Sequence, residues 1–267
     1  MRPSVCDLRL DVAGHNLQVR RIATPGDSDK LPIVLLHQGL GSITQWRSFP
    51  EMLAVACGRT VIAYDRLGHG RSDRVLLPRP ADFLDIEARI VLPELLDKLA
   101  FGSVAVYGHS DGGTIALLFA AAFPDRAKAV VSEAAHVFSE VETRSGFAEI
   151  IAAYESGDLR SRLARHHGDN IDTMFRGWVD AWQSPAMRNW HMLDQLSAIR
   201  SPVLALQGDN DEHGSPAQIG AIVKGVSGPV ESWFVPGCGH SPHFEAMDAV
   251  VPRVRTFLDR VLGVSGA

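Results

Sequence analysis

The most constraining feature of the chain is the segment SVAVYGHSDGGTIALLFAAAF, residues 103–123. An apolar, β-branched run passes directly into a glycine-rich turn, and the turn passes directly into a segment that is apolar on every helical face. A strand that turns at once into a helix forces the residue between them into a crowded backbone conformation. Gly108 and Gly112 flank Ser110 and lack the Cβ atoms that would collide there. We therefore expect Ser110 to stand above a sheet at the N-terminus of a buried helix.

Buried strands alternate with helical stretches along most of the chain. Continuous apolar runs predict strands within 31–39, 59–65, 102–108, 128–134, 201–208 and 228–237. Helical stretches follow at 46–57, 82–100, 114–123 and 249–263. This alternation is typical of a mainly parallel central β-sheet with helices on both faces, an α/β fold. The N-terminal segments 7–12 and 17–23 alternate apolar and polar residues instead, which predicts a hairpin.

Residues 137–199 interrupt the alternation with mostly helical sequence that contains three tryptophans, at 178, 182 and 190. We interpret this stretch as a helical lid inserted into the core. The core then comprises residues 1–136 and 200–267.

A serine hydroxyl becomes a good nucleophile only when a base removes its proton and a third group orients that base. Asp211 lies in the loop after the strand at 201–208, and His240 lies in the loop after the last strand. The order serine, acid, histidine is the one expected for this architecture. Asp209 is the rival acid, but a turn after Gly208 would use it for local backbone hydrogen bonds. His243 is the rival base and lies further from the strand end.

The reaction of such a serine also needs N–H donors for a developing oxyanion. We expect the backbone N–H of Asp111 to supply one. The loop 37–42 follows the first buried strand, and we expect Gly39 to supply the other donor, with Leu40 as the next choice.

Composition restricts the partners. The formal net charge of −5 disfavours nucleic acid, and no apolar run reaches the length of a membrane span. The N-terminus lacks the apolar core of a signal peptide. Three widely separated cysteines predict neither a disulfide framework nor a zinc site, and a cytoplasmic location is the simplest expectation. We expect a small-molecule substrate and no metal or organic cofactor, and a homodimer is left open.

The motifs together resemble the α/β-hydrolase fold family along nearly the whole chain. The segments that carry the resemblance are HQGLGS, AYDRLGHGRSD, GHSDGG, GDND and GCGHSPH. The resemblance implies the triad Ser110, Asp211 and His240. The sequence departs from the family at Gln38, where glycine is usual, and at Asp111, where the residue after the serine is usually apolar. An Asp111 carboxylate pointing into the pocket would repel anionic substrates.

The pattern is similar to small bacterial esterases and enol-lactonases of that family. We expect a serine hydrolase that cleaves a carboxylic ester, lactone or enol-lactone through an acyl-enzyme. Hydrolysis of a carbon–carbon bond in a dienoic diketone is the alternative, followed by thioester hydrolysis, cofactor-free oxygenation and ligand reception. The candidate substrate-binding residues are Leu40, His109, His136, Val137, Trp178 and Trp182.

Overall fold

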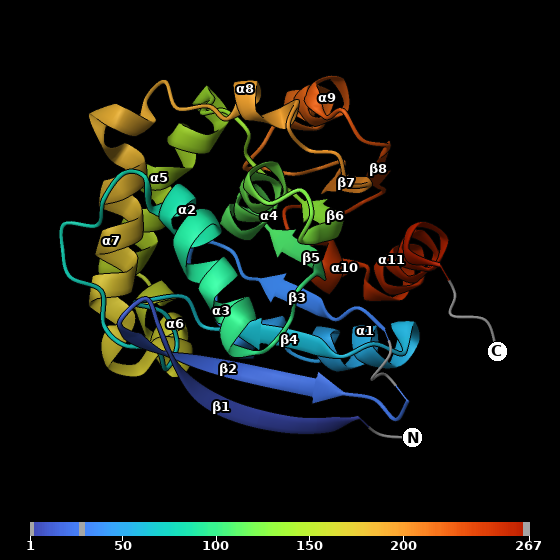
Figure 1. Cartoon of the computed structure of the whole chain (residues 1–267). Coiled ribbons are helices and arrows are strands. Elements are labelled where there is room, and N and C mark those ends of the chain that lie inside the picture. The colour runs from blue at the N-terminus through green and yellow to red at the C-terminus, as the bar shows by residue number, and fades with distance from the viewer. Residues whose placement is uncertain (1–2, 27–29, 264–267) are drawn as a thin grey trace.

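The computed structural model describes residues 3–26 and 30–263, with the backbone alone for 141–145. Its centre is an eight-stranded sheet in the order β1-β2-β4-β3-β5-β6-β7-β8 (Figure 1). The strands are β1 Ser4–Val12, β2 His15–Ala23, β3 Ile33–Leu36, β4 Val61–Tyr64, β5 Val104–His109, β6 Ala127–Glu133, β7 Val203–Gly208 and β8 Val230–Val235.

The central strands of the parallel part of the sheet are buried. β3, β4, β5 and β7 are buried along their whole length, as continuous apolar strands covered on both faces are. The six neighbouring strands β4, β3, β5, β6, β7 and β8 pair in parallel. β1 and β2 form an antiparallel hairpin closed by Ala13 and Gly14. β2 joins the parallel sheet by pairing antiparallel to β4. The predicted mainly parallel sheet is confirmed.

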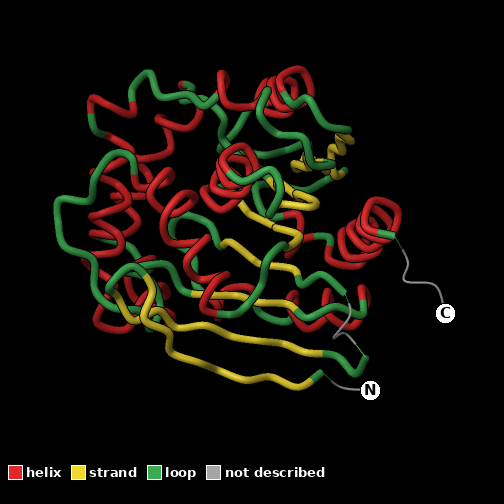
Figure 2. The backbone as a smooth tube through the Cα atoms, in the orientation of Figure 1, coloured by secondary structure: helices red, strands yellow, loops and turns green. Residues whose placement is uncertain are grey.

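Helices cover both faces of the sheet (Figure 2). The α-helices are α1 Phe49–Cys57, α2 Phe83–Ile86, α3 Leu92–Lys98, α4 Asp111–Ala122, α5 Val141–Glu155, α6 Leu159–His167, α7 Ile171–Gln183, α8 Leu193–Leu196, α9 Pro216–Gly225, α10 Pro242–Glu245 and α11 Met247–Leu262. A π-helical stretch, Glu87–Val91, joins α2 to α3. Short 3₁₀ turns span Ile43–Trp46, Gly168–Asn170 and Pro185–Met187.

Alternation along the strands divides the core into two layers. Val34 and Leu36 point to the layer that contains α2, α3, α4 and α9. Ile33 and Leu35 point to the opposite layer, which contains α1 and α11. α4 lies inside the first layer, and its residues 111–120 are all buried. The helix that begins beside Ser110 is therefore a core element, as its sequence predicts.

The insertion between β6 and β7 contains α5 to α8 (Figure 1). A single β-bridge, Phe138 to His191, joins its beginning to its end. Its action as a lid stays a prediction. Across the described residues, the helices fall short of the length and apolar character that a membrane span requires.

Candidate active site

The turn between β5 and α4 places Ser110 at the carboxyl edge of the sheet. Ser110 has φ 56° and ψ −119°, which is a strained conformation for a residue with a Cβ atom. A Cβ atom at Gly108 would overlap the backbone of Gly112, and one at Gly112 would overlap the carbonyl oxygen of Leu36. The flanking glycines thus allow the close packing that holds the strained serine. The Ser110 N–H also donates to the carbonyl oxygen of Glu133 on β6, at 2.8 Å.

The two loops at the ends of β7 and β8 bring an acid and an imidazole to Ser110. His240 Nε2 lies 2.9 Å from Ser110 Oγ, and His240 Nδ1 lies 2.8 Å from Asp211 Oδ1. The Asp211 carboxylate is nearly inaccessible, with 1% of its side chain exposed, and also accepts the backbone N–H of His213. Asp209 instead accepts the backbone N–H of Gly237. The structure therefore brings together the three side chains predicted from the sequence.

The surroundings of His240 favour its protonated form. Burial alone would lower the pKa of His240, but the hydrogen bond and negative charge of Asp211 outweigh it, and the pKa lies above its usual value. The charges of Glu212 and Glu133 add to this effect. Burial would raise the pKa of Asp211, but the hydrogen bond and charge of His240 hold it below the usual value. The pair is therefore arranged to stabilise an imidazolium.

The loop after β3 brings Gly39 to the cavity that Ser110 also lines. No acceptor among the described residues takes the N–H of Gly39, and Asp111 is the first residue of α4, where an N–H has no partner within the helix. The N–H of Leu40 donates to Gln38 Oε1 at 3.2 Å. Gln38 also fixes the loop through its carbonyl oxygen, which accepts from Gly41 N and Arg66 Nη2 at 2.9 Å each. Gly39 and Asp111 are thus the two free donors, whereas Leu40 is occupied.

A cavity of about 280 Å³ lies over Ser110 and His240. Of the predicted substrate contacts, Leu40, His136, Trp178 and Trp182 line it. Its other apolar lining residues are Phe147, Ile150 and Leu159.

Two predicted substrate contacts lie elsewhere. His109 faces the same side of the sheet as Tyr107, the side covered by α1 and α11, because alternate residues of β5 face opposite sides. Its Nε2 donates to the carbonyl oxygen of His240 at 2.8 Å. Val137 is fully buried in the core, and its N–H donates to Gln218 Oε1 at 2.8 Å. Neither residue lines the cavity over Ser110.

Comparison with known families adds a decisive observation. A model of the alpha/beta hydrolase fold matches residues 32–189, which is more than half of the chain. The chain belongs to the α/β-hydrolase fold family. This confirms the family that the sequence motifs resemble.

Individual relatives are more distant from this α/β-hydrolase. Human (lyso)-N-acylphosphatidylethanolamine lipase is 29% identical over 108 residues, which are 40% of this chain and 31% of the lipase. The 2-hydroxy-6-oxo-6-phenylhexa-2,4-dienoate hydrolase of Rhodococcus sp. strain RHA1 has a TM-score of 0.79 at 16% identity, with 96% of this chain and 99% of that chain covered. The enol-lactonase of Burkholderia xenovorans LB400 has a TM-score of 0.72 at 21% identity, with 94% and 99% covered. The chain thus matches under a third of the lipase, and the two structures show the shared fold.

The unusual Asp111 of this α/β-hydrolase connects α4 to α7. Its two carboxylate oxygens accept the indole N–H groups of Trp182 and Trp178, each at 3.2 Å. Arg66 Nη2, which is fully buried, lies 3.8 Å from Asp111 Oδ2. Burial raises the pKa of Asp111, while the charges of Arg66 and Arg79 and the indole hydrogen bonds counteract the increase. The carboxylate therefore has protein partners on both oxygens, and its charge is compensated by buried arginine.

A buried network behind the triad has no counterpart in the sequence prediction. Glu133, at the end of β6, accepts the backbone N–H of His243 at 2.8 Å and its Nδ1–H at 3.0 Å. Tyr107 donates to the other carboxylate oxygen at 2.5 Å. Burial would raise the pKa of Glu133, but His243, His109 and Tyr107 bring it down to about 2. Glu133, His109 and His243 have the residue types of a metal site, yet their hydrogen bonds engage both Glu133 oxygens.

Proposed function

We propose that this protein is a serine hydrolase of small carboxylic esters, lactones or enol-lactones. The observation that carries the proposal is the continuous hydrogen-bonded line from Ser110 Oγ through the His240 imidazole to Asp211. A hydroxyl with a base in contact and an acid behind that base is the arrangement that acyl transfer requires.

The reaction follows from the positions of these groups. His240 Nε2 takes the Ser110 proton while Oγ adds to the substrate carbonyl carbon, and the oxyanion receives hydrogen bonds from the N–H groups of Gly39 and Asp111. The intermediate collapses by breaking the bond to the leaving oxygen, which takes the proton from His240. Water then attacks the acyl-enzyme and gives a proton to His240. The second tetrahedral intermediate collapses by breaking its bond to Ser110 Oγ, which takes the proton from His240, and the carboxylic acid is released.

The cavity over Ser110 supports a short or flat apolar acyl group. Its apolar walls come from leucine, isoleucine, phenylalanine and two tryptophans, and its volume of about 280 Å³ is at the small end for ligand pockets. Asp111, His136, Glu212 and His213 also line it. The proteins that this chain is similar to include an enol-lactonase and a lipase, which agree with ester chemistry.

The test is a comparison of variants on a panel of p-nitrophenyl esters of increasing acyl length, with a lactone, a thioester and a dienoic diketone beside them. We expect the short esters or lactones to be cleaved fastest, and Ser110→Ala to lower kcat by at least about 10³-fold. Ser201→Ala is the matched control, because Ser201 is buried but its hydroxyl has no hydrogen-bond partner among the described residues. Full activity in Ser110→Ala would remove the nucleophile, and selective cleavage of the diketone would establish carbon–carbon hydrolysis instead.

A further inference from the structure

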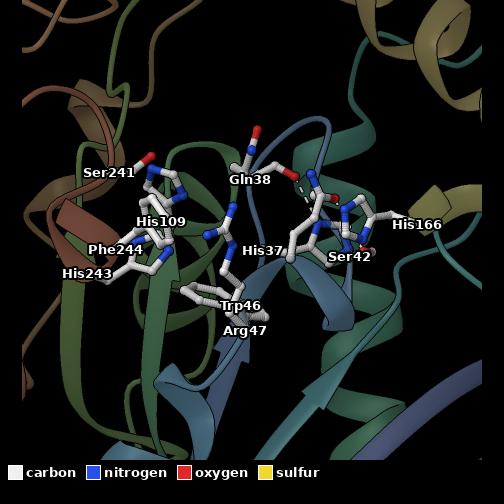
Figure 3. A pocket seen from close by; sticks show the side chains of 12 residues that line it. His37, Gln38, Ser42, Trp46, Arg47, His109, His166, Ser241, His243 and Phe244 are labelled. Atoms are coloured by element: carbon white, nitrogen blue, oxygen red, sulfur yellow. Dashed lines mark hydrogen bonds between the residues drawn. The ribbon is translucent and has the colours of Figure 1, made fainter. Parts of the chain in front are cut away.

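A second cavity, of about 200 Å³, adjoins the first at Gln38 and Ser241, which line both (Figure 3). We call it the polar cavity. The residues that line it are His37, Gln38, Gly41, Ser42, Gln45, Trp46, Arg47, His109, His166, Ser241, His243 and Phe244. Neither the nucleophile nor the aromatic walls of the first cavity take part in it. The steps proposed above give this space no role.

Polar atoms without protein partners line the polar cavity. His109 uses Nε2 for the His240 carbonyl, and His243 uses Nδ1 for Glu133. The second nitrogen of each ring therefore has no hydrogen bond to another described residue. None of the described lining residues is acidic. The polar cavity thus offers hydrogen-bonding atoms to a ligand and contains no carboxylate that would repel an anion.

Arg47 supplies the positive charge of the polar cavity. Its guanidinium carbon lies 4.0 Å from the centre of the Phe244 ring, and Figure 3 shows the guanidinium between the histidines at the left and His37 at the right. Among the described residues, no ion pair neutralises Arg47. Stacking on an aromatic ring leaves the N–H edge of a guanidinium available to a carboxylate or phosphate.

The backbone of Arg47 gives independent evidence. Arg47 has φ 51° and ψ −124°, nearly the same strained conformation as the nucleophile Ser110. Where the chain adopts these angles at residue 168, the residue is glycine, which carries no strain there. Strained residues persist where the surrounding structure holds them, and they cluster at functional sites. Arg47 is thus held in a strained conformation at the polar cavity, which agrees with a role for its side chain.

The place of the polar cavity indicates which part of a substrate reaches it. The leaving oxygen must be next to His240 Nε2 to receive its proton. Ser241 and His243 belong to the same loop as His240, and His109 binds the His240 carbonyl. Ser110 and His240 both line the first, apolar cavity, whereas the polar cavity borders the loop that carries His240. A leaving alcohol that extends beyond His240, past Gln38 and Ser241, therefore enters the polar cavity.

We propose that the polar cavity binds an anionic group on the leaving-alcohol half of the substrate, with Arg47 as the residue that recognises it. The apolar cavity takes the acyl half. The substrate class is therefore an ester between a small apolar acid and an alcohol that carries a carboxylate or phosphate. The reaction itself rests on the proposed hydrolase function, whereas binding of the anionic alcohol does not.

Binding is measured first, on Ser110→Ala, with 4-hydroxybenzoate as the anionic product and 4-hydroxybenzamide as its neutral analogue. We expect NMR or calorimetric titration to show tighter binding of the carboxylate, and Arg47→Gln in the same background to weaken it about fivefold to tenfold. 4-Hydroxyphenyl phosphate and hydroquinone form a second pair that shows whether phosphate is preferred to carboxylate. Equal binding of charged and neutral compounds, or no binding of either pair, would overturn the proposal even if the enzyme hydrolyses esters.

Kinetics provide the second measurement, with the butyrate esters of 4-hydroxybenzoate and 4-hydroxybenzamide. We expect Arg47→Gln to reduce the ratio of kcat/KM for the anionic ester to that for the neutral ester, mainly through KM, by a similar factor. Arg165→Gln is the matched control, because Arg165 also carries a charge near His166 but does not line the polar cavity. An equal fall of the ratio in Arg165→Gln would show general electrostatic attraction and contradict a contact at Arg47. Circular dichroism verifies that both variants are folded.

Discussion

In the proposed reaction, the His240 imidazole must be neutral to accept the Ser110 proton. Asp211 outweighs the effect of burial and raises the pKa of His240, so a larger fraction of the enzyme is protonated and inactive at mildly acidic pH. We predict that kcat/KM rises with pH and that the midpoint of the rise lies above about 6.5, the ordinary histidine value. Hydrolysis of p-nitrophenyl butyrate between about pH 5 and pH 8 measures this. A flat profile would contradict the assignment of His240 as the base.

Gly39 is a second residue whose environment gives a sharp expectation. A Cβ atom at this position would overlap the indole nitrogen of Trp178. We predict that Gly39→Ala displaces the N–H donor and lowers kcat by about 10²-fold, the usual effect of losing one oxyanion donor. A p-nitrophenyl ester assay on the purified variant measures the loss.

The collision at Gly39 can be separated from other effects by combining variants. Trp178→Phe removes the indole nitrogen, so it should restore part of the activity of Gly39→Ala. Gly102→Ala is the control, since a Cβ atom at Gly102 meets no atom within 4 Å. Strictly additive losses in the double variant would show that Trp178 and Gly39 do not interact in this way.

At the scale of elements, Glu133 connects β6 to both halves of the candidate site. Its carbonyl oxygen accepts the Ser110 N–H, and its carboxylate holds His243 in the loop that carries His240. Its negative charge also raises the pKa of His240. We predict that Glu133→Gln lowers kcat about tenfold with little change in KM, and moves the acidic limb of the pH profile to lower pH because the pKa of His240 falls.

Tyr107→Phe tests whether the effect of Glu133→Gln comes from the lost negative charge or from a lost hydrogen bond in the buried network. It removes the 2.5 Å hydrogen bond to Glu133 and leaves the charge in place. The free energy of unfolding should fall by about 1 kcal/mol, while the midpoint of the pH profile stays where it is in the wild type. If both variants moved the midpoint equally, or neither did, Glu133 would have only a structural role.

The elements that local sequence determines were predicted well, and those determined by distant partners were not. The strand, glycine turn and apolar helix around Ser110 have their cause within about twenty residues. Helix α9 is an exception, because its start is encoded locally: Ser215 accepts the N–H of Ala217, and Pro216 is the first helical residue. Its absence from the prediction reflects the two glycines of PAQIGAIVKG, which weaken the helical pattern.

The residues of the candidate site also differ in whether local sequence predicts them. The triad follows from loops at strand ends, a rule of the architecture. Glu133 lies within an apolar run, and nothing near it in the sequence indicates a partner 110 residues away. The pairing of Asp111 with two tryptophans of α7 depends on how the insertion docks, which no local pattern encodes. Strand alternation determines which side of the sheet His109 faces only if His109 belongs to β5, and the sequence prediction ended that strand at residue 108.

At the scale of the whole molecule, α4 connects the candidate site to the hydrophobic core. Phe119, on this helix, is fully buried in the same core layer as the α7 residues Met174 and Phe175. The first turn of α4 is held separately, by the close approach of Gly112 to Leu36 and by the hydrogen bond from Thr114 Oγ1 to the His136 carbonyl at 2.7 Å. The strain at Ser110 is therefore supported near the turn, while global stability depends on the rest of the helix.

This separation predicts that stability can be lost without loss of catalysis. Phe119→Ala should lower the free energy of unfolding by about 3–5 kcal/mol, because it leaves a cavity in a tightly packed core. Its kcat at a temperature where the variant remains folded should stay close to that of the wild type. Urea denaturation and ester hydrolysis on the same preparation measure both quantities. Met52→Ala is the control, since Met52 is 46% exposed and should change the free energy of unfolding by less than about 0.5 kcal/mol. A large fall in kcat of folded Phe119→Ala would show instead that the core layer itself holds the serine in its strained conformation.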